Sequence, residues 1–165
     1  MHNNQPTRDR LLHMDDATLL RHCRTDVFRG TGRGGQKRNT TESAVRLTHE
    51  LTGISAENDD TRSQAKNRTL ALRELRRQLA LQWRQPPPAK WPHSSAPGKR
   101  SPDFALWMAH LLDACEAFQY RISDIARFCN TSTAQLVKDL TLDRQLWRHI
   151  NEQRREHGHK PLKIR

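Results

Sequence analysis

Residues 29–41 read Arg29-Gly30-Thr31-Gly32-Arg33-Gly34-Gly35-Gln36-Lys37-Arg38-Asn39-Thr40-Thr41. Four glycines fall within six residues of this stretch, and glycine tolerates positive φ angles and close approach of the backbone. The stretch therefore predicts a loop of unusual shape. Its cations suit contact with closely spaced phosphates, and they are Arg29, Arg33, Lys37 and Arg38. Composition alone favours another interpretation, a disordered RNA-binding linker.

The residues on either side of this loop predict strands. Residues 26–29 predict a strand that leads into the loop, and Glu42–His49 alternate apolar and polar residues as a strand does. Residues 50–53 predict a tight turn that ends in a glycine, and residues 54–58 resume the alternation. A loop joined directly to a hairpin is held at its base, which favours a presented loop over a disordered linker.

Three segments of this region resemble the catalytic domain of class I peptide chain release factors, and they come in the same order. They are Gly32-Arg33-Gly34-Gly35-Gln36, then Asn39-Thr40-Thr41-Glu42-Ser43-Ala44-Val45-Arg46-Leu47-Thr48-His49 with Thr52-Gly53-Ile54, then Thr61-Arg62-Ser63-Gln64-Ala65-Lys66-Asn67-Arg68. The resemblance covers roughly residues 25–80. A Gly-Gly-Gln triplet alone is a weak signal, whereas the triplet with this downstream series is specific.

The resemblance implies a chemistry for the loop. In release factors the Gly-Gly-Gln loop enters the ribosomal peptidyl transferase centre and promotes hydrolysis of the ester that joins peptide to tRNA. Gly34, Gly35 and Gln36 would then be the catalytic residues, with the Gln36 backbone N–H donating to the oxyanion and its side chain shaping the space for water. No Ser-His-Asp, Cys-His or paired-carboxylate pattern is apparent around the loop. The resemblance implies no cofactor.

The partners implied by the resemblance are the large-subunit rRNA and the P-site peptidyl-tRNA. The candidate RNA-binding residues are Arg29, Arg33, Lys37, Arg38, Arg46, Arg62, Lys66 and Arg68. Three of these cations stand at the start of a predicted helix, where they oppose the helix dipole and so need another reason to be there. The alternative for helix cations is a solvated face, which we favour for Arg73 and Arg77. Arg33 and the pair Lys37-Arg38 depart from the family's usual loop residues and make this loop more basic.

The chain is too short for the stop-codon-reading domains of full-length release factors, and nothing before residue 25 or after residue 84 resembles them. Codon-independent release, as in ribosome-rescue hydrolases, is therefore the favoured hypothesis. Two alternatives from other classes are a nucleic-acid-binding regulator and a ribosome-associated factor that does not hydrolyse the ester.

The composition predicts a polyanionic partner and a soluble protein. The chain has 165 residues and a formal charge of +11, which is spread over its whole length. Three cysteines at irregular spacings fit neither a disulfide framework nor a zinc pattern, which indicates a reducing compartment and no metal site. No apolar run approaches the length of a membrane span. We expect a cytoplasmic monomer.

The pattern along the chain predicts an α+β fold in four parts: a mobile leader (1–14), a Gly-Gly-Gln domain (15–83), a proline-rich basic linker (84–103) and a helical domain (104–165). Asp15 or Asp16 caps a short helix through about Cys23. A long helix spans Ser63 to Trp83, with a stripe of apolar residues at Leu72, Leu75, Leu79 and Trp83.

The proline-rich segment and the helical domain have their own predicted features. The prolines favour an extended spacer, and the linker and the helical domain are candidates for rRNA or mRNA contact. Residues 104–117 predict a helix, and residues 122–137 resemble a helix-turn-helix, with Ala126 at the helix contact and Asn130 in the turn. A third helix ends near Gly158. Such units often pack without reading bases.

Overall fold

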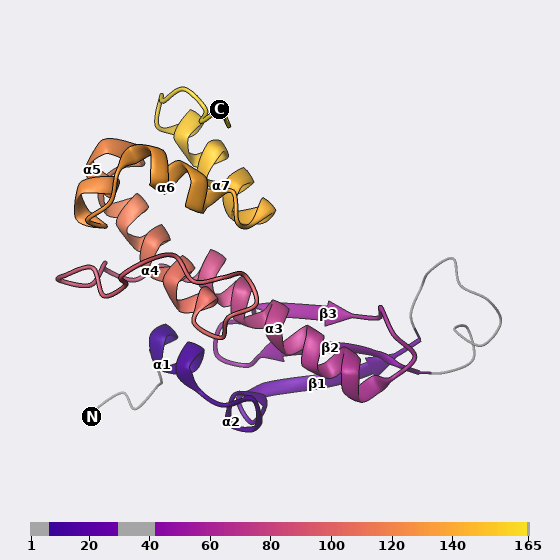
Figure 1. Cartoon of the computed structure of the whole chain (residues 1–165). Coiled ribbons are helices and arrows are strands. Elements are labelled where there is room, and N and C mark those ends of the chain that lie inside the picture. The colour runs from indigo at the N-terminus through magenta and orange to yellow at the C-terminus, as the bar shows by residue number, and fades with distance from the viewer. Residues whose placement is uncertain (1–6, 30–41, 165) are drawn as a thin grey trace. The chain divides into compact units, whose positions relative to one another are not determined.

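The computed structural model describes residues 7–29 and 42–164, and the chain divides into two compact units, residues 1–82 and 83–165 (Figure 1). The first unit contains a three-stranded sheet and a long helix, and the second contains helices. The predicted α+β class is therefore confirmed. Among the described residues, no helix has the length and apolar character that a membrane crossing requires. The elements of the first unit are α1 (Arg8–His13), α2 (Asp16–Leu20), β1 (Cys23–Phe28), β2 (Ala44–His49), β3 (Ser55–Asn58) and α3 (Gln64–Gln82).

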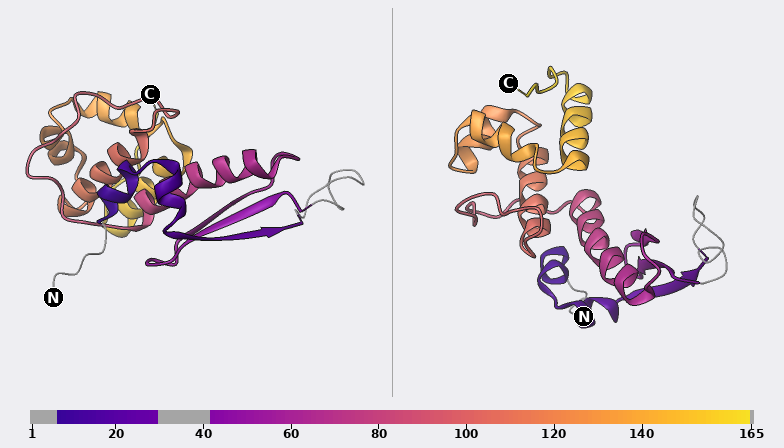
Figure 2. Two further views of the ribbon diagram at one scale, coloured as in Figure 1. Left: turned by 90° about the horizontal axis from the view of Figure 1, so that it is seen from below. Right: turned by 45° about the vertical axis from the view of Figure 1, so that its right-hand side comes forward.

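The sheet has the order β1-β2-β3, and both pairs of strands are antiparallel. The predicted hairpin is present: Thr48 pairs with Ser55, and Gly53 in the turn has a φ of +69°. The first strand is longer than predicted because all six residues of β1 pair with β2. Helix α3 packs on one face of the sheet (Figure 2). That face buries the alternating residues Val45 and Leu47 of β2 completely.

The long helix follows its predicted stripe. It runs from Gln64 to Gln82, one residue shorter at each end than predicted. Leu72, Leu75 and Leu79 are buried, and this apolar face holds the helix on the sheet. Trp83 lies just beyond the end of the helix and is half-buried.

The segment before the sheet is more ordered than predicted. A mobile leader was expected for residues 1–14, but α1 occupies Arg8–His13 and packs against α3. The reason is the adjacent pair Leu11 and Leu12, whose side chains are buried. Asp15 caps α2 through its side chain, as predicted, and α2 ends at Leu20 because the chain enters β1 at Cys23.

The buried His49 predicts a pH dependence of stability for the first unit. Burial lowers the pKa of His49, and the nearby His22 lowers it further. The unfolded chain therefore binds more protons than the folded chain, so the stabilisation is present above about pH 6.5 and is lost as the pH falls. Urea unfolding at about pH 7.5 and about pH 5.5 measures it. We expect His49→Gln to reduce the difference in the free energy of unfolding between the two pH values. His13 is exposed, so His13→Gln should leave that difference unchanged. Equal effects of the two variants contradict the assignment of the pH dependence to His49.

The second unit is a helical bundle. Its helices are α4 (Phe104–Ala117), α5 (Ile122–Phe128), α6 (Thr133–Leu140) and α7 (Arg144–Glu156). The helix-turn-helix pattern is confirmed in α5 and α6. Ala126 is buried, Asn130 takes a φ of +52° in the turn, and the Ser132 side chain caps α6 by accepting from the Gln135 N–H. Helix α7 buries Leu146 and Ile150 and ends before Gly158, as the pattern predicted.

The proline-rich segment packs on the helices of its own unit instead of extending away from them. Residues 83–103, all of which are described, form neither helix nor strand. The Trp91 ring meets the Phe128 ring of α5 edge-on, with centroids 6.0 Å apart, and His93 Nε2 lies 2.9 Å from Nδ1 of the buried His110 on α4. Lys99 Nζ lies 3.2 Å from the carboxylate of Asp143, which caps α7. The prolines keep this backbone out of regular structure, while its aromatic residues attach it to the bundle.

Candidate functional site

The glycine-rich segment begins and ends on neighbouring strands. Phe28, the last residue of β1, pairs with Ala44, the first residue of β2. The chain therefore leaves the sheet and returns to it at the same end, and the exposed Arg29 and Glu42 still approach each other there, with Nε 3.9 Å from Oε1. The catalytic candidates Gly34, Gly35 and Gln36 and the RNA-binding candidates Arg33, Lys37 and Arg38 lie outside the described residues.

A buried asparagine holds the base of this segment. Asn67 in the first turn of α3 is fully buried and uses both ends of its amide. Its Nδ2 donates to the Ser43 carbonyl at 2.8 Å and to the Thr61 carbonyl at 2.7 Å. Its Oδ1 accepts from the backbone N–H of Thr61 at 3.0 Å and from the Thr61 hydroxyl at 2.8 Å. The helix, the β3–α3 connection and the residue that leads from the glycine-rich segment into β2 are thereby fixed to one another.

Asn67 lies in one of the segments that resemble release factors, but the sequence predicted no role for it. A buried asparagine inside a helix is unusual, because short polar side chains there compete with the backbone for hydrogen bonds. The available signal was its position on the same face as Ala71 and Leu75, which is the apolar side of α3. An amphipathic helix buries the side chains on its apolar face, so the amide of Asn67 at this position was expected to be buried.

The candidate Arg46 has contacts within the sheet. Its side chain is on the open face of β2, where Nε and Nη2 donate to Glu57 Oε2 at 3.0 and 2.7 Å. Its guanidinium carbon lies 5.2 Å from the centroid of the Phe28 ring, which is a cation–π geometry. These contacts give Arg46 a structural role at the base of the glycine-rich segment, and its contact with RNA stays a prediction.

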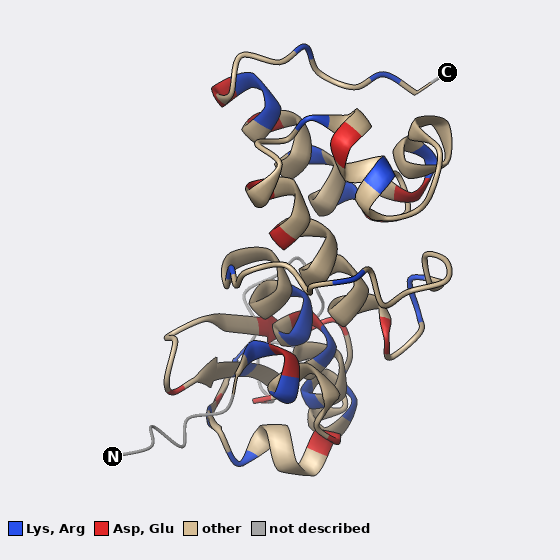
Figure 3. Cartoon of the chain, turned by 90° about the vertical axis from the view of Figure 1, so that its left-hand side faces the viewer, with Lys and Arg blue, Asp and Glu red and all other residues tan. Residues whose placement is uncertain are grey.

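The candidates at the start of α3 differ in exposure. Arg62 and Lys66 are exposed, whereas Arg68 is half-buried and its Nε has no hydrogen-bond partner among the described residues. Lys and Arg occur along both units (Figure 3), which agrees with the spread of charge in the sequence. Among the three candidates near the start of α3, the exposed pair Arg62 and Lys66 is therefore the part that the described structure leaves open to a partner.

The described side chains offer neither a metal cluster nor a reactive thiol. Within residues 7–29 and 42–164, no group of three or more His, Cys, Asp or Glu residues could hold a metal ion. Burial raises the pKa of Cys23 to about 11 and that of Cys129 to about 12, and it also raises the pKa of Cys115. Thiols with such pKa values stay protonated at neutral pH and are poor nucleophiles.

Comparison with known proteins shows which domain this arrangement is similar to. Residues 18–98 match the family model described as the RF-1 domain, and this segment contains all three strands, α3 and the glycine-rich segment. The resemblance seen in the sequence is confirmed, because residues 18–98 match the RF-1 domain and the similar proteins are named peptide chain release factors.

The similar proteins are themselves release factors. Peptide chain release factor 1 of Lachnoclostridium phytofermentans is 57% identical over 60 residues, which are 36% of this chain and 17% of that protein. Peptide chain release factor 1 of Anaeromyxobacter dehalogenans is 59% identical over 54 residues, 33% of this chain and 15% of that protein. Peptide chain release factor 2 of Staphylococcus saprophyticus is 46% identical over 68 residues, 41% of this chain and 17% of that protein. The chain spans less than a fifth of the length of these curated relatives.

Proposed function

We propose that this chain acts on the ribosome in the cytoplasm and hydrolyses the ester of peptidyl-tRNA without reading a stop codon. The observation that carries the proposal is the base of the glycine-rich segment. Its two ends stand on paired neighbouring strands, and Asn67 fastens the returning end to α3. A Gly-Gly-Gln segment held in this way, within a domain of the RF-1 family, has the rigid support that a presented catalytic loop needs.

The chemistry proposed for the loop needs little from side chains. By the resemblance, the Gln36 backbone N–H donates to the oxyanion of the tetrahedral transition state, while Gly34 and Gly35 permit the backbone turn. A single preorganised donor of this kind contributes about 3–4 kcal/mol of transition-state stabilisation, and positioning the water adds more. Ribosomal RNA and the hydroxyl of the tRNA would supply the rest of the machinery.

Independence from a stop codon is supported by the part of the chain outside the matched segment. Residues 104–164 form a helical bundle with a helix-turn-helix, and they lie outside the segment that matches the RF-1 domain. The similarity to the release factors above covers 54 to 68 residues of this chain. We propose that the helical unit provides contacts with RNA in place of codon recognition.

A release assay tests the function. Ribosomes carrying formyl-methionyl-tRNA in the P site are prepared with three mRNAs, which place a stop codon, a sense codon or no codon in the A site. We expect the full chain to release formyl-methionine from the complex without an A-site codon, and a stop codon to give no additional rate. Release only with a stop codon contradicts codon independence. Binding to ribosomes without release on any of the three complexes favours the non-hydrolytic factor, and absence of ribosome binding favours the nucleic-acid-binding regulator.

The exposed cations at the N-terminal end of α3 and just before it give a separate prediction about RNA affinity. We expect the double variant Arg62→Ala, Lys66→Ala to bind ribosomes more weakly and to lower the slope of log K against log salt concentration by about 1 for each side chain removed. Arg73→Ala is the matched control, because Arg73 is also exposed, lies on α3 as Lys66 does, and is assigned by us to solvent. If Arg73→Ala lowers the slope by as much per charge removed as the double variant does, Arg62 and Lys66 contribute no more to RNA binding than Arg73 does.

A further inference from the structure

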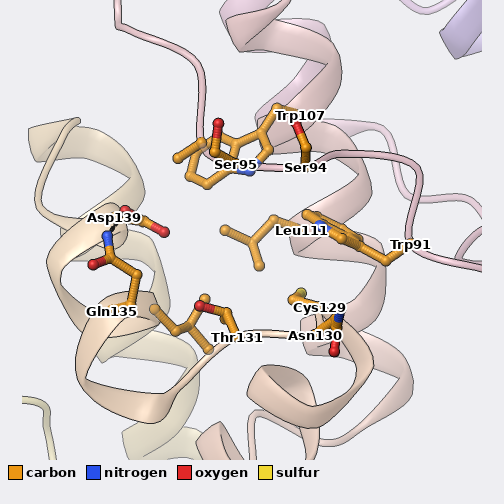
Figure 4. A pocket seen from close by; sticks show the side chains of 12 residues that line it. Trp91, Ser94, Ser95, Trp107, Leu111, Cys129, Asn130, Thr131, Gln135 and Asp139 are labelled. Atoms are coloured by element: carbon orange, nitrogen blue, oxygen red, sulfur yellow. Dashed lines mark hydrogen bonds between the residues drawn. The ribbon is translucent and has the colours of Figure 1, made fainter.

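The helical unit contains a cavity that the proposed release chemistry does not use. Its volume is about 200 Å³ (Figure 4), which is smaller than the roughly 300–1,000 Å³ of pockets for drug-sized ligands. Helix α4, helix α6 and the proline-rich segment each provide part of its wall. The residues that matter for recognition are Trp107 from α4, Gln135 and Asp139 from α6, and Trp91, Ser94 and Ser95 from the proline-rich segment.

The walls of this cavity combine aromatic surface with a fixed carboxylate. Figure 4 shows Gln135 and Asp139 on one side and Trp91 on the other, with Leu111 between them. The Gln135 side chain donates from Nε2 to Asp139 Oδ1 at 2.7 Å, which holds the carboxylate in place. An ionised carboxylate accepts at several lone pairs, so Asp139 can take further N–H donors. The cavity therefore suits a flat ligand that carries N–H groups on one edge.

A second hollow adjoins the cavity, and the charged side chain that lines it is a cation instead of a carboxylate. Both hollows are lined by Asn130 and Thr131, so they share a wall in the turn between α5 and α6. The second hollow also has Arg127 and the hydroxyl residues Ser132 and Thr133. The Arg127 side chain is 80% exposed, and its contact with Asp124 is a surface ion pair at 3.4 Å that another anion can replace. Arginine and hydroxyl groups are common partners of phosphate oxygens.

An aromatic cavity beside a cationic hollow matches the two parts of one nucleotide, its base and its phosphate. Proteins that recognise single-stranded RNA stack unpaired bases on aromatic side chains and bind their Watson–Crick edges by hydrogen bonds. Among the four RNA bases, guanine presents two adjacent N–H donors on that edge, which match the two oxygens of a carboxylate. Uracil presents a single N–H between two carbonyls, which a carboxylate repels. Adenine and cytosine place an acceptor nitrogen beside their amino group.

We propose that this cavity binds an unpaired guanine of single-stranded RNA, with Asp139 accepting from the base edge, Trp91 contacting the base and Arg127 contacting the phosphate. An arginine side chain of a protein partner also complements a carboxylate next to tryptophan. The excess of Lys and Arg within residues 83–165 favours RNA, because a cationic partner is repelled by this unit and a polyanion is attracted. The inference does not depend on the release chemistry, and its test uses no ribosomes.

The test measures the binding of the full chain to labelled RNA heptamers by fluorescence anisotropy at one salt concentration. Each heptamer is oligouridine with guanine, adenine, cytosine or uracil in the middle position. We expect the guanine heptamer to bind at least about tenfold more tightly than the other three. A heptamer with hypoxanthine in the middle lacks one of the two N–H donor groups, so we expect it to lose most of this preference. This comparison changes only the RNA, so it does not depend on the folding of any variant.

Variants assign the preference to named residues. We expect Asp139→Asn to reduce the preference for guanine to less than about threefold, because one acceptor becomes a donor. Arg127→Ala should weaken all heptamers by a similar factor and keep the preference. The matched control is Glu152→Gln, which neutralises an exposed carboxylate on α7 outside the cavity. Circular dichroism and thermal melting show whether each variant is folded.

Three outcomes overturn the inference. The first is equal affinity for all heptamers, and the second is equal affinity for guanine and hypoxanthine. The third is a guanine preference that persists in a folded Asp139→Asn variant. If a short peptide with a single arginine binds in a manner that requires Asp139, while the guanine heptamer shows no preference, the cavity takes a protein side chain instead.

Discussion

The Gly35→Ala variant is expected to release peptide roughly 100- to 1,000-fold more slowly than the unaltered protein, which is the loss seen when one oxyanion donor is removed. By the resemblance, the main chain at Gly34 and Gly35 makes the turn that aims the Gln36 N–H at the reacting ester. A Cβ restricts that backbone to the conformations of ordinary residues, so the donor moves out of line. Rapid-quench measurement of formyl-methionine release, with the protein in saturating excess over the ribosome complex, gives the single-turnover rate constant directly.

Two further variants make this result specific. Gly98→Ala is the matched glycine control, because Gly98 does not have a positive φ and an added Cβ there meets nothing within 4 Å; its release rate should be unchanged. Gln36→Ala keeps the backbone N–H, so we expect a smaller loss than for Gly35→Ala. Release by Gly35→Ala at the unaltered rate contradicts the assignment of residues 34–36 as catalytic.

The Asn67→Ala variant should be both less stable and slower in release. Alanine leaves the carbonyls of Ser43 and Thr61 and the N–H of Thr61 without their partner in a buried place. Each unsatisfied buried group costs about 1–3 kcal/mol, so we expect the free energy of unfolding to fall by about 2–4 kcal/mol. The returning end of the glycine-rich segment then loses its link to α3, which should lower the rate constant of release in protein that is still folded. Urea unfolding and single-turnover release measure the two effects separately.

Control variants separate positioning from stability. Asn58→Ala removes an asparagine whose side chain bonds locally to Asp60, so we expect it to cost less than about 1 kcal/mol and to leave release unchanged. Leu75→Ala should destabilise α3 by about 2–5 kcal/mol without touching the link to Ser43. If folded Leu75→Ala and folded Asn67→Ala release peptide at the same rate, Asn67 acts only through stability.

The parts of the fold that follow local periodicity were predictable from the sequence. The apolar stripe gave α3 to within one residue at each end, and Phe104–Ala117 was predicted with the bounds that α4 has. The alternation around Val45 and Leu47, with Gly53 in the turn, predicted the hairpin. These signals depend on residues close together in the chain, where the side-chain period specifies which face is buried.

The features that the sequence did not reveal depend on contacts between distant residues. The link from Asn67 to Ser43 spans 24 positions, and no local pattern marks the carbonyl that an asparagine will bind. The proline-rich segment was predicted to be a spacer because prolines exclude regular structure, but Trp91 meets a ring on α5 that its neighbours in the chain do not predict. The proposed catalytic triplet, residues 34–36, was found through the resemblance, since the chemistry proposed for it lies in backbone groups that every residue has.

The packing of residues 91–99 against α4 and α5 decides where the chain can be truncated or fused to another protein. The boundary between the two units falls after Gln82, so a truncated version of the helical unit should begin at residue 83 and not at Phe104. A version that starts at Phe104 loses Trp91 and His93 and uncovers the apolar surface beneath them. Chimaeras that exchange residues 1–82 for the matching domain of a release factor should likewise be fused after Gln82, so that Trp91 and the rest of the proline-rich segment stay with their own helices.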